Sequence, residues 1–202
     1  MNPLRSLAER SHWIFDLDGT LTLAVHDFAS IRRELAIPQE CDIIGYLTAL
    51  PDHQAEPLHR RLQEIEEELA HATRVATGAL ELLQLLSARN VCLGVLTRNT
   101  RTNAQRTLEL VGLDRFFAAH AIIGRDEALP KPEPDGVHQL AELWGVPPAV
   151  TVMVGDYLYD LQAGRRAGAL TIHVDAADTG RRWPEYADLE ISSLEEIVAW
   201  LR

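Results

Sequence analysis

Three apolar segments of the chain each end in polar side chains that could take part in catalysis. The first runs into Asp16 and, two residues later, Asp18, while the second ends at Thr97 and the third at Asp156. Apolar, β-branched runs of this length are typical of buried parallel strands, whose carboxyl ends meet at one edge of an open α/β sheet. The sequence therefore predicts that three carboxylates and a hydroxyl gather at one site.

Such a cluster needs positive charge close by. Two carboxylates about 4 Å apart repel each other by roughly 4 kcal/mol at an effective dielectric constant near 20. Mg²⁺ suits ligands of this kind, because it accepts a few carboxylate oxygens and keeps several waters. The second cation that we expect is Lys131, the single lysine among 19 basic residues. It lies between Pro130 and Pro132, on the stretch that joins the second of these segments to the third.

These residues resemble the four sequence motifs of the haloacid dehalogenase-like hydrolases. "DLDGT" (16–20) is similar to the first motif, Thr97 to the second, Lys131 to the third and "GDYLYD" (155–160) to the fourth. They occur in the family's order and at its spacing over about residues 12–175, with a helical segment after the first motif. The resemblance implies a Mg²⁺-dependent phosphatase that works through an aspartyl-phosphate.

The resemblance also implies a role for each acidic residue. Asp16 would attack the phosphorus atom, which divides one difficult step into two. Asp18 would protonate the leaving oxygen and would then deprotonate the water that releases phosphate. Mg²⁺ would be held by the carboxylate of Asp16, the main-chain carbonyl of Asp18, and Asp156.

The remaining motif residues are expected to bind the phosphoryl group. Thr97 would donate a hydrogen bond to it near the start of the following helix, where free N–H groups favour anions. Arg98 is expected beside Thr97 as a second phosphate-binding residue. Lys131, positioned by Asp160, would offset the negative charge on the nucleophile and on the transferring group.

The residues also bear on other activities of the same scaffold. Family members that cleave carbon–halogen bonds lack the acid at the position of Asp18, and those that cleave phosphonates need a cap lysine, which this chain does not have. A sugar-phosphate mutase of the phosphoglucomutase-like kind stays open, because His26 lies roughly where such mutases place a cap histidine. An inert binding protein is disfavoured, since every motif position holds a competent residue.

A signalling receiver domain is a rival from another class. It also uses a phosphorylatable aspartate, a threonine or serine, a lysine and an acidic metal pair on an α/β sheet. Receivers place the paired acids after the first strand and the acceptor aspartate on the third, with no helical insertion. The acceptor-type D-x-D of residues 16–18 at the first strand, followed by a helical segment, disfavours this class.

The elements that position these residues follow from the pattern of apolar runs. Five segments predict strands: 12–16, 91–97, 120–124, 150–156 and 170–175. Helical patterns lie between them, one ending at Gly112 and one running from Pro134 to Gly145. This alternation predicts an α/β fold with a Rossmann-like, doubly wound parallel sheet. Residues 22–78 have helical spacing without a strand, which predicts an all-helical cap inserted into a core of residues 1–21 plus 79–202.

Composition limits the kinds of partner. A formal net charge of −11 over 202 residues argues against a nucleic acid or an anionic membrane, but leaves room for a small anion bound by local charge. No apolar run has the length of a signal peptide or approaches the roughly 18 residues of a membrane span. We therefore expect a cytoplasmic monomer or homodimer that acts on a small phosphorylated metabolite.

The segment that enters the cap is unusual for the family. It reads "LTLAVHDF" (21–28), where many phosphatases of this type continue with a valine or leucine, an aspartate and a serine. The resemblance therefore implies no particular substrate, such as phosphoglycolate. Four cap arginines could reach a second anionic group of the substrate, although we expect each to face solvent: Arg32, Arg33, Arg60 and Arg61.

Overall fold

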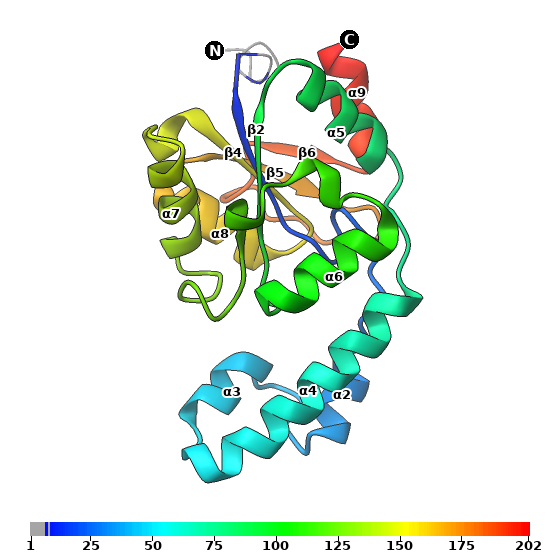
Figure 1. Ribbon diagram of the computed structural model, residues 1–202, viewed down its shortest axis with the longest axis vertical. Helices are drawn as coiled ribbons and strands as arrows, with labels where there is room; N and C mark the ends of the chain where they lie inside the picture. The colour runs from blue at the N-terminus through cyan, green and yellow to red at the C-terminus, as the bar shows by residue number, and fades with distance from the viewer. Residues whose placement is uncertain (1–6, 8) are drawn as a thin grey trace.

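The computed structural model describes Leu7 and residues 9–202, and its core is a single parallel sheet (Figure 1). The six strands lie in the order β3-β2-β1-β4-β5-β6. Their bounds are β1 His12–Phe15, β2 Cys92–Leu96, β3 Ile122–Ile123, β4 Thr151–Gly155, β5 Leu170–Val174 and β6 Leu189–Ile191. The predicted α/β fold with a doubly wound sheet is confirmed.

Helices cover both faces of the sheet because side chains alternate along each strand. In β1, Trp13 and Phe15 belong to the larger apolar cluster and Ile14 belongs to the smaller one on the other face. The first face is covered by α5 (Ala79–Ala88), α6 (Arg101–Val111) and α9 (Leu194–Leu201). The second face is covered by α7 (Asp135–Leu143) and α8 (Leu158–Ala167).

A helical insertion follows β1, as the sequence predicted, and it lies away from the sheet in Figure 1. It consists of α2 (Phe28–Glu34), α3 (Ile43–Ala49) and the long α4 (Asp52–Ala72). These helices share a separate apolar cluster that includes Ile31, Leu47 and Leu62. We call this insertion the cap.

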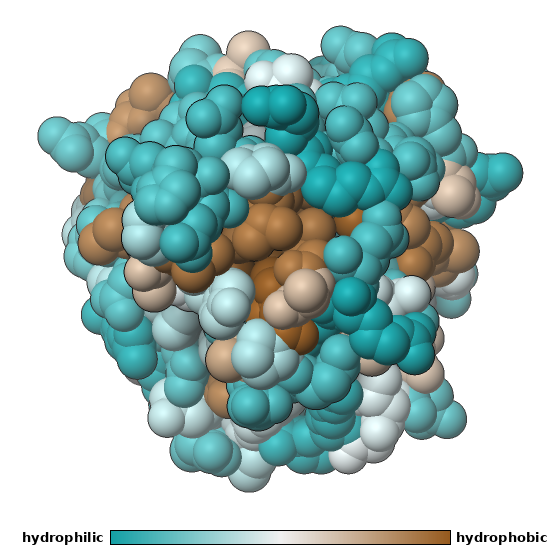
Figure 2. All heavy atoms as spheres, turned by 90° about the horizontal axis from the view of Figure 1, so that it is seen from below, coloured by the Kyte–Doolittle hydropathy of each residue, from teal (hydrophilic) through white to brown (hydrophobic). Residues whose placement is uncertain are grey.

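Two short chain segments join the cap to the core side by side. Thr22 forms an antiparallel bridge with Val75, and the amide of Leu23 donates to the carbonyl of Arg74 at 2.9 Å. We propose on this basis that the cap spans residues 22–78 and that residues 1–21 and 79–202 form the core. Seen from the end at which the cap lies, the molecule carries an apolar patch surrounded by hydrophilic side chains (Figure 2).

The end of the chain adds elements that the sequence did not predict. β6 and α9 complete the sheet and one of its helical layers. β6 is only Leu189-Glu190-Ile191 at the edge of the sheet, and a three-residue strand with a central acid has no apolar run to mark it. Among the residues that the structure describes, no helix is long and apolar enough to cross a membrane.

Candidate active site

Lys131 lies at the centre of the candidate site, where its ammonium group makes three short polar contacts. Nζ lies 2.5 Å from Oδ1 of Asp16 and 2.6 Å from Oδ1 of Asp160, and it donates to the carbonyl of Leu96 at 2.7 Å. The lysine side chain is only 3% exposed. A buried ammonium is stabilised only when it is paired in this way, so the three contacts fix both its position and its charge.

The sheet explains why residues so far apart in the chain meet here. β1 lies between β2 and β4, so Asp16 after β1, Thr97 after β2 and Asp156 after β4 emerge at the same edge. The amide of Asp16 donates to Val154 at 2.9 Å, and the amide of Thr97 donates to Ile123 at 3.0 Å. These bonds continue the strand pairing to the residues that form the site.

Asp160 is positioned by the first turn of α8. Its Oδ1 lies beside Lys131, and its Oδ2 accepts a hydrogen bond from the amide of Tyr157 at 3.0 Å. A Cβ on Gly155 would lie 2.2 Å from the Cβ of Asp160, so the glycine at the end of β4 is needed for this close approach. These contacts hold the Asp160 carboxylate between Lys131 and the start of α8.

Three carboxylates form a compact acidic cluster around the lysine. One oxygen from each of Asp16, Asp156 and Asp160 lies within 4.8 Å of the others. Burial, reinforced by the charge of Asp160, raises the pKa of Asp156 to about 7. Burial also raises the pKa of Asp16, although Lys131 opposes the shift. Burial lowers the pKa of Lys131, but the attraction of Asp16 and Asp160 outweighs it and raises that pKa overall.

The donor set fits a hard divalent cation. Asp156 packs so closely on the turn after β1 that a Cβ on Gly19, whose φ is +93°, would lie 2.3 Å from Oδ2 of Asp156. The turn and β4 together therefore hold the Asp156 carboxylate beside that of Asp16. Because burial and the neighbouring charge of Asp160 raise the pKa of Asp156, a cation bound between these oxygens would favour its ionised form. Oxygen ligands of this kind suit Mg²⁺.

Asp18 and Thr97 lie at the rim of this cluster. Asp18 is half-buried and forms a bridge with Thr22, and its charge contributes to raising the pKa values of Asp16 and Asp156. The side chain of Thr97 is buried, and its Oγ1 accepts a hydrogen bond from the amide of Asn99 at 3.0 Å. α6 begins soon afterwards, with Thr100 as its N-cap.

The side chain of Arg98 contacts the cap, which the sequence did not predict. Its Nη2 donates to Oδ1 of Asp42 at 2.6 Å, and its guanidinium lies over the ring of Tyr159 at 4.9 Å. Its buried Nε has no hydrogen-bond acceptor among the described residues. Asp42 is also the N-cap of α3 and accepts from the amide of Gly45 at 2.8 Å.

A second ion pair joins cap and core nearby. Arg125, from the loop after β3, donates from Nη1 and Nη2 to the two carboxylate oxygens of Glu66 on α4 at 2.6 and 3.0 Å. Burial raises the pKa of Glu66, Arg125 offsets this in part, and the charges of His26 and Asp18 also act on it. Glu66 is therefore, with Asp42, a cap carboxylate that pairs with an arginine of the core.

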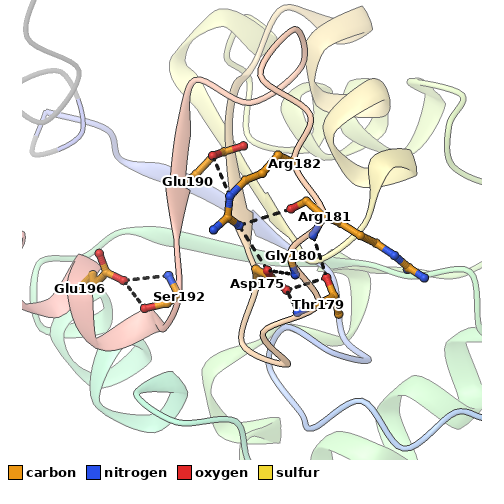
Figure 3. Close-up of polar contacts among 8 residues, drawn as sticks. All are labelled: Asp175, Thr179, Gly180, Arg181, Arg182, Glu190, Ser192 and Glu196. Carbon is orange, nitrogen blue, oxygen red and sulfur yellow. Dashed lines mark hydrogen bonds and ion pairs between the residues drawn. The ribbon is translucent and has the colours of Figure 1, made fainter.

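The loop after β5 is held by a network of polar contacts (Figure 3). Asp175 accepts from the amide and the hydroxyl of Thr179, both at 2.8 Å, and from the amide of Gly180 at 3.0 Å. Arg182 lies between Asp175 and Glu190. This network fixes the loop that carries Trp183, which packs edge-on against Tyr157, the residue after Asp156.

The cap residues singled out from the sequence lie mainly toward solvent or toward other cap residues. The ring of His26 stacks on that of Phe28, with centroids 5.5 Å apart. Arg60 pairs with Glu56, Arg61 pairs with Glu34, and Arg33 is exposed. Arg32 donates to the carbonyl of Cys41 at 2.8 Å.

Comparisons with known proteins agree with this geometry. The family model described as haloacid dehalogenase-like hydrolase matches residues 12–168. The phosphoglycolate phosphatase of Agrobacterium fabrum is 31% identical over 195 residues, covering 85% of this chain and 81% of that protein. A haloacid dehalogenase-like hydrolase domain-containing protein of Arabidopsis thaliana is 27% identical over 194 residues, covering 90% and 76%.

A solved structure has the same architecture along its whole length. The crystal structure of a hydrolase from Pseudomonas syringae superposes with a TM-score of 0.79 at 27% identity, covering 95% of this chain and 98% of that one. The family match spans most of the chain and both aspartate motifs. The protein is therefore a member of the haloacid dehalogenase-like hydrolases.

Proposed function

We propose that the protein is a Mg²⁺-dependent phosphatase that hydrolyses a small phosphorylated metabolite through an aspartyl-phosphate on Asp16. The observation that carries this proposal is the buried contact of Lys131 with Asp16 and Asp160, next to the oxygens of Asp156. The phosphatase names among the relatives support the same reaction class. When bound by Asp16, Asp156 and the main-chain carbonyl of Asp18, Mg²⁺ would supply positive charge to a phosphoryl group.

The proposed reaction has two steps, with the roles of Asp16 and Asp18 that the family resemblance implies. In the first, a carboxylate oxygen of Asp16 forms a bond to phosphorus while the bond to the ester oxygen breaks, and Asp18 gives that oxygen a proton. In the second, Asp18 takes a proton from a water that attacks phosphorus, and the bond to Asp16 breaks. The carboxylate of Asp16 is regenerated and inorganic phosphate leaves.

The residues around Asp16 would stabilise the charge that develops during transfer. Lys131 already lies 2.5 Å from Oδ1 of Asp16, so no reorganisation is needed to place its charge at the reacting group. Thr97 and the unused Nε of Arg98 are the donors that we propose for the phosphoryl oxygens. Asp160 would hold Lys131 in place and would not touch the substrate.

The proposal is tested with p-nitrophenyl phosphate and then with a panel of phosphorylated metabolites. We expect release of phosphate that requires Mg²⁺ and disappears in Asp16→Asn. The matched control is Asp114→Asn, an exposed aspartate of the core after α6, which should behave as the wild type. Equal activity in Asp16→Asn would remove Asp16 as the nucleophile. The panel should include phosphoglycolate, because the Agrobacterium relative bears that name.

A further inference from the structure

Two arginines lie between the candidate site and the cap, and cap carboxylates neutralise both. The first is Arg98, whose Nη2 lies 2.6 Å from Asp42. Burial acts to raise the pKa of Asp42, but hydrogen bonds from Arg98 and the amide of Gly45 outweigh it and lower that pKa. Asp42 is therefore ionised near neutral pH and cancels the charge of Arg98.

The second arginine is Arg125, which is held by both oxygens of Glu66. The two side chains are only 7% and 9% exposed, so this ion pair is buried between the cap and the core. Nη1 of Arg125 also donates to the carbonyl of Arg98 at 3.2 Å, which connects the two pairs. A buried pair of this kind resists disruption, because removing either partner leaves a charge without compensation.

The sheet order places the first pair across the mouth of the site. Arg98 follows β2, and Tyr159, over whose ring its guanidinium lies, follows β4. Because β1 lies between these two strands, the Arg98–Tyr159 contact spans the carboxyl end of β1, where Asp16 emerges. The leaving group of a phosphate ester bound at Asp16 would point away from the sheet, toward the cap and these ion pairs.

The cleft beside the second pair is acidic as well. A cavity of about 510 Å³ lies between the cap and the core, and Arg125 is on its wall. Three further wall residues are carboxylates of the core: Asp126, Glu127 and Asp135. The positive charge of Arg125 is matched by Glu66, and Glu127 lies 3.7 Å from Arg101, so the further negative charge on this wall comes from Asp126 and Asp135.

We propose that this arrangement selects phosphate monoesters whose leaving group is uncharged, such as a polyol, and disfavours esters that carry a carboxylate or a second phosphate. The inference rests on the phosphatase activity proposed above and names its substrate class. An additional anion would either face the carboxylates of Asp42 and Glu66 or have to displace one of them from its arginine. Hydroxyl groups can instead donate to these same carboxylates, so one arrangement both accepts polyols and rejects anions.

The test uses two esters that differ mainly in charge at one carbon. Glycerol 3-phosphate carries a hydroxymethyl group where 3-phosphoglycerate carries a carboxylate. With Mg²⁺ present, kcat/KM is measured for both, and each is measured as a competitive inhibitor of p-nitrophenyl phosphate hydrolysis. We expect the wild type to favour glycerol 3-phosphate by about tenfold or more, the effect of one unfavourable charge contact at a largely desolvated site.

Asp42→Asn is the most informative variant. Asparagine can still cap α3, because its side-chain oxygen can accept from the amide of Gly45, but it no longer neutralises Arg98. The preference for glycerol 3-phosphate should fall by about tenfold in this variant. Glu66→Gln should also reduce the preference for glycerol 3-phosphate. Thermal unfolding of this variant checks that the cap is still folded. Glu64→Gln, on the exposed part of α4, is the matched control and should leave the preference unchanged.

Three outcomes would overturn the inference. One is equal or better use of 3-phosphoglycerate by the wild type. Another is an unchanged preference in folded Asp42→Asn and Glu66→Gln. The third is an equal shift in the control Glu64→Gln. Failure of the proposed activity is distinguishable, because calorimetric titration of the Mg²⁺-loaded protein with each ester measures the discrimination in binding even without turnover.

Discussion

Replacing Lys131 by arginine keeps the positive charge but changes the shape of the cation at the centre of the site. The ammonium makes three contacts, at 2.5 Å to Asp16, 2.6 Å to Asp160 and 2.7 Å to Leu96. A guanidinium is planar and larger, so it cannot direct donors to these three oxygens from one buried point. We expect Lys131→Arg to lose at least two of the contacts during phosphoryl transfer.

The size of the effect follows from the strength of these bonds. A hydrogen bond to a charged group contributes about 1.5–3 kcal/mol, so losing two of them raises the barrier by about 3–6 kcal/mol. This corresponds to a fall in kcat of about 10²- to 10⁴-fold. The assay is Mg²⁺-dependent hydrolysis of p-nitrophenyl phosphate, with thermal unfolding to show that the variant is folded.

A matched control tests whether exchanging arginine and lysine affects kcat at a position outside the site. Arg106→Lys makes the reverse exchange at an exposed residue of α6 that pairs with Glu109, and we expect its kcat to equal that of the wild type. A kcat of folded Lys131→Arg within about threefold of the wild type, which is less than 1 kcal/mol, would refute the reasoning. Positive charge alone would then be sufficient at this position.

Three further predictions concern the acidic cluster. Gly19→Ala should lower kcat more than tenfold and weaken Mg²⁺ binding, because the Cβ of the new alanine would lie 2.3 Å from Oδ2 of Asp156. The control is Gly112→Ala, at a similar positive φ but with open space around the added Cβ, which should only lower Tm. Asp160→Asn should lower kcat by about tenfold, because Lys131 loses one ionic partner; unchanged kinetics would exclude a positioning role. Burial raises the pKa of Asp156 from 3.8 to about 7, so the metal-free protein should lose stability as the pH rises through this range. The increase in Tm on adding Mg²⁺ should grow over the same range, because the metal binds the ionised carboxylate. A Mg²⁺ effect on Tm that is constant across this range would contradict the role of Asp156.

Much of the fold could be predicted because short segments of the sequence indicate their own secondary structure. β1, β2, β4 and β5 are apolar, β-branched runs, and each lies within one or two residues of its predicted bounds. Glycine marks the C-terminus of α6 at Gly112, and proline marks the start of α7 after Pro134, because both residues have special backbone preferences. β6 escaped prediction because an edge strand of three residues depends on its neighbour β5 for its hydrogen bonds.

Some residues of the candidate site could be predicted from local sequence, and others depend on contacts between distant parts of the chain. The positions of Asp16 and Asp156 follow from the strands that they end, and the motif spacing indicated Lys131. The contacts between core and cap could not be found in this way. Arg98 and Asp42 are 56 residues apart, and Arg125 and Glu66 are 59 residues apart, so no periodic pattern connects them. Only the folded position of the cap brings these charges together.

The most direct test of the proposed function is to detect the covalent intermediate. The protein is quenched in acid during turnover with Mg²⁺, an acyl phosphate is reduced with borohydride, and the peptides are mapped by mass spectrometry. The account predicts that the residue at position 16 is converted to homoserine, and that this product is absent without substrate and in Asp16→Asn. Sustained turnover with an unmodified Asp16, or modification of another carboxylate in its place, would contradict it.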